Sequence, residues 1–199
     1  SDKDKALLRN MKPMTRTYFQ DRDSTGRELS PGQIEFFKDS KVRDENGSLM
    51  VLYHGTPNRF TTFRQRVAQG WGKGIYFTDN KEDASEYGEN IVEAYLNITN
   101  PYIADTMSYD DIGAEKTKAY RDFDMRVWED RFDEYETYED YKNDGMGVDM
   151  YDIYTEDVEV FNKILRELGY DGIIAKESNN INGFEIVAFN ENQPKLTTN

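Results

Sequence analysis

The tetrapeptide YHGT occupies residues 53–56, and GKGIYFTD follows at residues 72–79, beginning eighteen residues after the histidine. His54 is the single histidine in a chain of 199 residues. Upstream of it, Asn46-Gly47 favours a type I′ turn, and apolar residues then fill both alternating sets of positions. This pattern predicts a hairpin that leads into a central strand, with His54 and Gly55 at its end.

Helix caps and strand patterns predict the remaining elements. Ser30 and Pro31 are typical of a helix start, and Asn80 and Gly88 are suited to begin and end another helix. Helices are expected at residues 31–38, 80–88, 123–132 and 157–169, and strands at residues 74–78, 170–176 and 184–190. The segment at residues 91–105 alternates well enough for another strand, which Asn100-Pro101 ends. Strands dominate both ends and helices lie between them, so the expected class is α+β rather than alternating α/β.

The length suits one domain, with residues 1–30 as a linker or lead-in helix and residues 31–199 as the domain itself. The net charge of −14 is concentrated in one segment. Residues 105–159 contain 19 acids and 6 bases, whereas the rest of the chain contains 20 acids and 19 bases. We therefore expect an acidic helical insertion at about residues 105–159, whose charge disfavours non-specific binding to nucleic acid.

Composition excludes several classes of site. The absence of cysteine excludes disulfides and thiolate metal sites, and one histidine excludes any site that needs two imidazoles. No twelve-residue loop has the EF-hand carboxylate pattern, so we expect no metal. No stretch approaches the roughly 20 apolar residues of a membrane span, so we expect a cytoplasmic protein without membrane association.

The order of the motifs resembles a known family. YHGT, then GKGIYF with a tyrosine eleven residues beyond Tyr76, then the late segment FEIVAFNENQ, resembles the His-Tyr-Glu branch of ADP-ribosyltransferases. This branch includes diphtheria-type toxins and poly(ADP-ribose) polymerases, and the likeness is greatest to domains of phage and prophage polyvalent proteins. It covers about residues 42–196, with the acidic insertion outside it. It implies two packed, mostly antiparallel β-sheets around an NAD cleft with flanking helices.

The resemblance also implies roles for single residues. It assigns His54, Tyr87 and Glu185 as the catalytic triad: His54 bonds the adenosine ribose, Tyr87 stacks on the nicotinamide, and Glu185 stabilises the oxocarbenium-like sugar. NAD is thus the expected substrate. Further NAD contacts are expected from Gly55, whose bare backbone suits the nicotinamide amide, from Thr56, from Tyr76 on the opposite ring face, and from Ser85.

Some positions depart from the family or add to it. The serine that a family member places three residues before the stacking tyrosine is Ala84 here, so Ser85 is the expected substitute. Gly183 stands two residues before Glu185, where the arginine-modifying branch carries glutamate or glutamine, which makes arginine a less favoured acceptor. The loop at residues 176–183 corresponds to the family's acceptor-selecting loop. Arg64 and Arg66 are candidates for contacts with the pyrophosphate.

These residues predict a mono-ADP-ribosyltransferase, a phage-encoded toxin or effector, acting as a monomer on a macromolecular acceptor, with protein favoured over nucleic acid. NAD hydrolysis with water as acceptor is an alternative. A second is an inactive binding module that works through its acidic insertion, where a basic or immunity partner would bind. A tRNA 2′-phosphotransferase shares the fold, but it would need a basic surface that this chain lacks.

Overall fold

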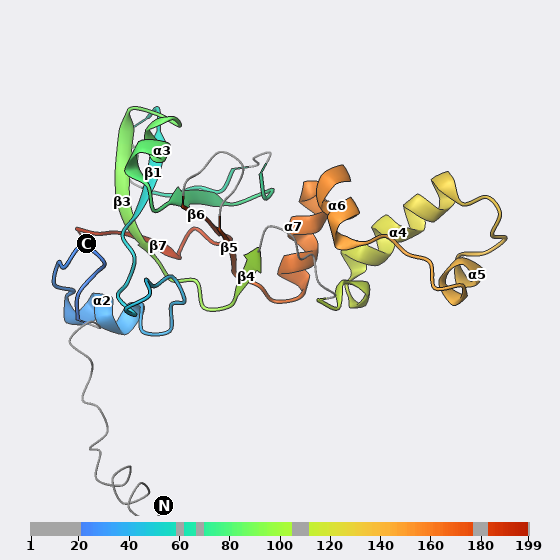
Figure 1. Ribbon diagram of the computed structural model, residues 1–199, viewed down its shortest axis with the longest axis horizontal. Coiled ribbons are helices and arrows are strands. Elements are labelled where there is room, and N and C mark those ends of the chain that lie inside the picture. Colours follow the sequence, from blue (N-terminus) through green and yellow to red (C-terminus); the bar gives the residue numbers. More distant parts are fainter. Residues whose placement is uncertain (1–20, 59–61, 67–69, 105–111, 177–182, 199) are drawn as a thin grey trace, which may run out of the picture.

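A computed structural model describes residues 21–58, 62–66, 70–104, 112–176 and 183–198 of the chain (Figure 1). The strands are β1 (Leu52–Thr56), β2 (Ile75–Thr78), β3 (Asn90–Leu96), β4 (Pro101–Ala104), β5 (Gly172–Lys176), β6 (Phe184–Ala188) and β7 (Pro194–Leu196). The helices are α2 (Pro31–Phe36), α3 (Lys81–Ser85), α4 (Lys118–Arg131), α5 (Tyr138–Asn143), α6 (Met150–Glu156) and α7 (Val158–Glu167), with the 3-10 helix η1 (Ala114–Lys116).

The described strands form one seven-stranded sheet in the order β4-β5-β6-β2-β1-β3-β7, and only the β4–β5 pair is parallel. The expectation of mostly antiparallel pairing is confirmed, but two packed sheets are not found. The sheet is nevertheless weakly paired at the boundary between β1 and β2, which we call the seam. β1 pairs with β3 through five residues, whereas it pairs with β2 through Tyr53 and Thr78 alone. The sheet therefore consists of two halves, β4-β5-β6-β2 and β1-β3-β7, joined at one position.

Local sequence signals placed several elements correctly. α2 begins with a capping box in which Ser30 and Gln33 each bond the other's backbone N–H. Asn80 caps α3 by accepting from the backbone N–H of Glu82, and Asp157 caps α7 by accepting from that of Val160. β1 has neighbours on both sides, which confirms the prediction of a central strand.

The prediction of one strand in residues 91–105, ended by Asn100-Pro101, is confirmed in its first part only, because a second strand begins where the first was expected to end. β3 ends at Leu96 and β4 begins at Pro101. The carboxylate of Asp171 accepts from the backbone N–H groups of Thr99 and Asn100, which fixes the turn between the two strands. The turn is thus stabilised by a residue about 70 positions away, which a local pattern does not reveal.

The two faces of the sheet carry separate cores. One cluster includes Phe77, Ile186 and Leu52, and the other includes Val187, Trp71 and residues from α4, α6 and α7. The second cluster contains Phe123 and Val127 of α4 together with the buried side of α7. The described part of the acidic segment therefore shares a core with the sheet.

The acidic segment lies within the connection between two parallel strands. β4 and β5 are adjacent and parallel, so the chain between them must cross back over the sheet. Figure 1 shows α7 beside β4 and β5, and α4, α5 and α6 extending beyond it, away from the β1-β3-β7 half. Among the described residues, no helix is both long and apolar enough to cross a membrane.

Residues 21–29 pack onto the sheet, and residues 1–20 of the predicted lead-in lie outside the described part. Asp23 is buried and its carboxylate accepts from the hydroxyl of Tyr95 on β3, at 2.7 Å. Leu29 joins Phe37 and Tyr95 in a third apolar cluster. The segment before α2 is therefore held by a buried polar contact as well as by apolar packing.

Candidate active site

Glu185 lies at the second position of β6, directly opposite Thr78 on β2 and Ala175 on β5. Its Oε2 accepts a hydrogen bond of 2.9 Å from the indole Nε1 of Trp71. Burial raises the pKa of the Glu185 carboxyl, and the hydrogen bond from Trp71 partly opposes the rise. The strand therefore presents a half-buried carboxylate with a fixed neutral donor on one oxygen.

Tyr76 on β2 contacts the glycine-rich turn GWGKG at residues 70–74, which lies beside this carboxylate. Its hydroxyl donates to the carbonyl of Gly72 at 2.6 Å and accepts from the backbone N–H of Trp71 at 2.9 Å. A Cβ added to Gly70 would lie 3.6 Å from Cε1 of Tyr76 and 4.0 Å from Oε1 of Glu185. The turn thus passes directly beside Glu185. The expected contact of Tyr76 with nicotinamide stays a prediction, and its hydroxyl is engaged in holding the turn.

Tyr87 follows α3 and is the most exposed of the candidate aromatic residues, with 62% of its surface accessible. A Cβ added to Gly55 of β1 would lie 3.2 Å from Cβ of Tyr87. Partial burial raises the pKa of the Tyr87 hydroxyl, and the charge of Glu185 adds to the rise. An open aromatic ring, a bare stretch of β1 backbone and the carboxylate therefore lie within electrostatic range of one another.

Gly55 is required by packing as well as by any ligand. A Cβ at this position would lie 1.7 Å from the carbonyl oxygen of Ala84, which is itself buried in α3. No atom fits at that distance, so the contact between β1 and α3 depends on glycine. The departure at Ala84 has the same cause, because this residue faces β1 and is almost fully covered.

His54 lies where the two sheet halves meet, between β1 and β2. Its ring packs near Phe63 and Phe77, with centroid distances of 5.9 Å and 5.4 Å, which places it toward the opposite face from Glu185. Its Nδ1 lies 2.7 Å from the carbonyl oxygen of Tyr76. Because a carbonyl only accepts, Nδ1 carries the hydrogen, and a neutral ring then leaves Nε2 as an acceptor. His54 thus bridges β1 and β2 beyond the single residue pair that joins their backbones.

We expect the imidazole to stay neutral at physiological pH. Burial lowers the pKa of His54, and the positive charge of Arg66 lowers it further, against the opposing hydrogen bond to Tyr76. Because the chain has one histidine, an NMR titration reports this residue without assignment. The expected result is a pKa below about 6.5 with the hydrogen on Nδ1. A pKa above that value would contradict the burial of the ring, and a neutral ring with its hydrogen on Nε2 would contradict the bridge.

Thr56 and Ser85 use their hydroxyls locally. Thr56 is buried, and its Oγ1 donates to the carbonyl of Asn58 at 3.2 Å within the turn that follows β1. Ser85 is exposed at the end of α3, and its hydroxyl donates to the carbonyl of Glu82 at 2.6 Å. Ser85 lies two residues before Tyr87, and the Thr56 backbone lies against Gly88, the residue after it, while the contacts of both with NAD stay predictions.

Glycine at position 183 also has a packing reason. A Cβ on Gly183 would lie 2.3 Å from Oδ1 of Asp79, which accepts from the backbone N–H of Phe184 at 2.8 Å. The φ of Gly183 is 154°, at the margin of the range that side chains rarely adopt. A side chain two residues before Glu185 would therefore have to displace the Asp79 carboxylate from the backbone N–H of Phe184. Residues 177–182 of the expected acceptor loop lie outside the described residues.

The two arginines expected at the pyrophosphate differ in their placement. Arg66 is exposed, pairs through its backbone with Gly74, and acts electrostatically on His54. Arg64 is exposed, and the structure gives no reason to associate it with the site. Arg66 is thus the better placed of the two.

Sequence reasoning missed two aromatic residues beside Glu185. Trp71 bonds the carboxylate directly, and Tyr154 of α6 packs on the Trp71 ring with a centroid distance of 5.1 Å. Trp71 comes directly before the GKGIYFTD segment, but nothing in the local sequence indicates that its indole reaches a residue 114 positions away.

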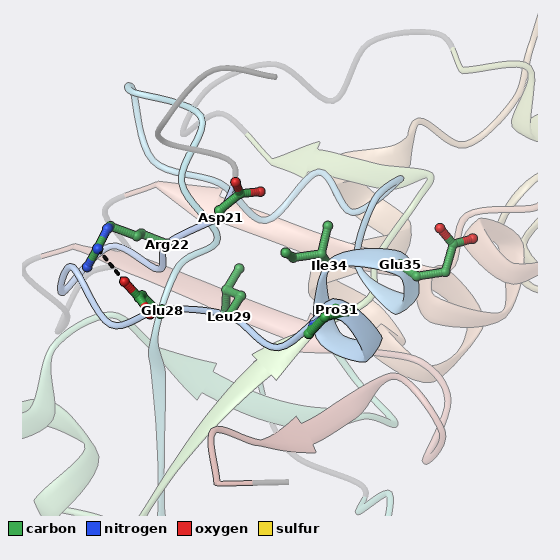
Figure 2. Close-up of a pocket in the computed structure, with 7 residues that line it drawn as sticks. All are labelled: Asp21, Arg22, Glu28, Leu29, Pro31, Ile34 and Glu35. Atoms are coloured by element: carbon green, nitrogen blue, oxygen red, sulfur yellow. Dashed lines mark hydrogen bonds and ion pairs between the residues drawn. The ribbon is translucent and has the colours of Figure 1, made fainter. Parts of the chain in front are cut away.

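A pocket of about 460 Å³ lies elsewhere (Figure 2). It is lined by Asp21, Arg22, Glu28, Leu29, Pro31, Ile34 and Glu35, between the first described residues and α2. Arg22 and Glu28 close one side of it through an ion pair of 2.6 Å. None of the candidate site residues contributes to this pocket.

The chain was compared with protein families, curated proteins and solved structures. No curated protein matches the chain. Seven chains of solved structures match, including one from a crystal structure of an anti-CRISPR protein, with 15% identity and a TM-score of 0.37 over 71% of this chain and 90% of that one. Residues 44–199 match the family described as ADP-ribosyltransferase in polyvalent proteins. Since that match spans most of the sequence and all of the candidate site, the chain belongs to the family of ADP-ribosyltransferases in polyvalent proteins.

Proposed function

We propose that the chain is a mono-ADP-ribosyltransferase of the His-Tyr-Glu branch, which cleaves the nicotinamide–ribose bond of NAD and transfers ADP-ribose to a macromolecule. The observation that carries the proposal is the environment of Glu185. A carboxylate whose pKa is raised by burial stands within electrostatic range of the exposed ring of Tyr87, and that ring borders the bare backbone of Gly55. Family membership supplies the reaction class.

The residues fit the chemistry that NAD requires. The bond between C1′ of the ribose and the nicotinamide nitrogen breaks, nicotinamide leaves with the bonding electrons, and positive charge develops on the sugar. A carboxylate near that charge stabilises it, and a partly desolvated carboxylate does so more strongly than an exposed one. The acceptor then forms a bond to C1′ and loses its proton. We assign two roles to Glu185: it stabilises the positive charge on the sugar, and it orients the acceptor.

The other two members of the triad hold the dinucleotide. The open face of Tyr87 offers a flat surface for the nicotinamide ring, where stacking and cation–π attraction contribute about 0.5–2 kcal/mol. We assign His54 to the adenosine ribose, because the Nε2 of a neutral ring that carries its hydrogen on Nδ1 has the chemistry of an acceptor for a ribose hydroxyl. Since Nδ1 is fixed on the carbonyl of Tyr76, the imidazole is oriented before a ligand arrives.

We infer that the acceptor is a protein and that its modified side chain is not arginine. The overall charge of −14 disfavours nucleic acid, and Gly183 stands where the arginine-modifying branch carries glutamate or glutamine, a side chain that would have to displace Asp79 here. A role as a phage-encoded toxin or effector fits the family's occurrence in polyvalent proteins. The acidic segment at residues 105–159 would suit a basic partner.

Labelled NAD tests this proposal. A lysate is incubated with the protein and labelled NAD, and mass spectrometry then locates ADP-ribose on macromolecules. We expect label on a protein with the unaltered chain and a large loss with Glu185→Ala. Equal labelling by both, or none by either, would contradict transfer by this site.

A parallel incubation without lysate separates transfer from hydrolysis. NAD and protein alone should release nicotinamide slowly, and the lysate should increase the release. Rapid formation of free ADP-ribose in buffer would instead make the chain an NAD glycohydrolase that uses the same Glu185.

A further inference from the structure

We propose that Trp71 is a positioning residue for Glu185, and that α6 and α7 of the helical connection hold Trp71 in place. The inference rests on the proposed function of Glu185. It gives the helices between β4 and β5 a role in the reaction, because Tyr154 of α6 and Asn162 and Phe161 of α7 contact Trp71.

The indole distinguishes the two oxygens of the carboxylate. Its Nε1 donates to Oε2 of Glu185 at 2.9 Å. The other oxygen, Oε1, would lie 4.0 Å from a Cβ added to Gly70. The indole therefore holds one oxygen, and we assign the other to the ribose hydroxyl.

The backbone of Trp71 is held on both sides. Its N–H donates to the hydroxyl of Tyr76, and its carbonyl accepts from Nδ2 of Asn162 on α7 at 2.7 Å. Asn162 is only 2% exposed, and its Oδ1 accepts from Nε of Arg166. A Cβ on Gly72 would lie 2.9 Å from the carbonyl oxygen of Val158, so the turn is in close contact with the start of α7.

The indole ring is held by α6 and α7 as well. Tyr154 of α6 lies 5.1 Å from it at a tilt of 34°, and Phe161 of α7 lies 6.3 Å away. Tyr154 and Phe161 also meet edge to face at 5.3 Å. With 8% of its surface exposed, Trp71 is too enclosed to turn away while these helices are in place.

The groups that face Glu185 make the indole electrostatically important. Among the described residues, the hydroxyls of Tyr76, Tyr87 and Tyr154 interact electrostatically with Glu185, and burial raises the pKa of each, so all three remain neutral across the working pH range. The carboxylate of Glu159 at the start of α7 lies against Gly72 in the same turn and acts on Tyr76. The N–H of Trp71 lowers the pKa of Glu185, whereas burial raises it. Without the indole N–H, Glu185 should ionise only at a higher pH.

Trp71→Phe tests the proposal because it keeps an aromatic ring and removes the donor. We expect kcat for ADP-ribosyl transfer to fall about ten- to hundredfold with KM for NAD within about twofold, and the acidic limb of the pH–rate profile to move to higher pH. Trp128→Phe is the matched control. Its Nε1 is buried without a hydrogen-bond partner in the described structure, so this variant should retain the rate and the pH profile.

A second measurement does not depend on activity. The ¹³C shift of the Glu185 carboxyl, followed by NMR, should titrate at higher pH in Trp71→Phe than in the unaltered chain. If the unaltered chain shows no reaction with NAD, the proposed function fails while this titration still tests the contact. An unchanged titration, or an active Trp71→Phe with unaltered kcat and pH profile, would overturn the positioning role.

Tyr154→Leu provides a variant that leaves the donor in place. Removing the ring that packs on Trp71 should also lower kcat, but by a smaller factor than Trp71→Phe does. If circular dichroism shows that Trp71→Phe does not fold, Tyr154→Leu becomes the test. An unaltered kcat and an unaltered titration of Glu185 in Tyr154→Leu would then overturn the proposal.

Discussion

Glu185→Gln is expected to lower the rate of ADP-ribosyl transfer by about a hundredfold or more while the affinity for NAD changes little. The amide is nearly isosteric and can still accept from Trp71, so the packing and the hydrogen bond at 2.9 Å survive. What disappears is the negative charge opposite the developing positive sugar. The rate is measured as nicotinamide released and label transferred, and the affinity by calorimetry with NAD.

Glu191→Gln is the control for this experiment. Glu191 lies on the loop after β6, is exposed, and accepts from the backbone N–H of Gln65 at 3.2 Å, a bond that glutamine can keep. It should therefore behave like the unaltered chain. If Glu185→Gln keeps full activity, the carboxylate of Glu185 has no role in the reaction.

The pH dependence follows from the same carboxyl. Because burial raises the pKa of Glu185, the charged form that stabilises the sugar appears only above the ordinary range of glutamate. The rate should therefore rise with pH through that raised pKa and then level. Glu185→Gln should lack this limb, and a limb that persists in the variant would belong to another group.

Gly55→Ala is expected to have the largest structural effect. Its new Cβ would meet the carbonyl oxygen of Ala84 at 1.7 Å, and both contacting groups belong to backbone segments that cannot rotate away. α3 must shift from β1, at a cost on the order of 3 kcal/mol. For a chain of this size, that cost corresponds to a fall in melting temperature of about 6–12 °C, measurable by scanning calorimetry.

The same substitution should also impair NAD binding, because Tyr87 follows α3 and lies against Gly55. Gly32→Ala in α2 is the control, since only the Ser30 hydroxyl lies near the added methyl, at 3.9 Å, and alanine is favoured in a helix. It should leave the melting temperature unchanged or slightly raised. An unaltered melting temperature in Gly55→Ala would show that α3 does not pack on β1 as described.

Short-range signals in the sequence predicted much of the fold. Ser30, Asn80 and Asp157 cap helices through bonds to residues two or three positions away, and such bonds form wherever the local sequence allows them. The order of YHGT, GKGIYF and FEIVAFNENQ pointed to the ADP-ribosyltransferase family, which the match over residues 44–199 confirms. Family roles for His54, Tyr87 and Glu185 came with that resemblance and stay predictions until tested.

The sequence by itself thus indicated many of the elements, though not α5, α6 or β7, together with the family and the candidate residues, since each depends on local pattern or motif order. Only the tertiary structure decided that the strands form one sheet with a single-pair seam, that Gly55 is glycine because of Ala84, and that Trp71 bonds Glu185. These features join segments far apart in the chain, 114 positions in the last case. Which distant groups meet is fixed by the packing of the whole fold, and no local preference encodes it.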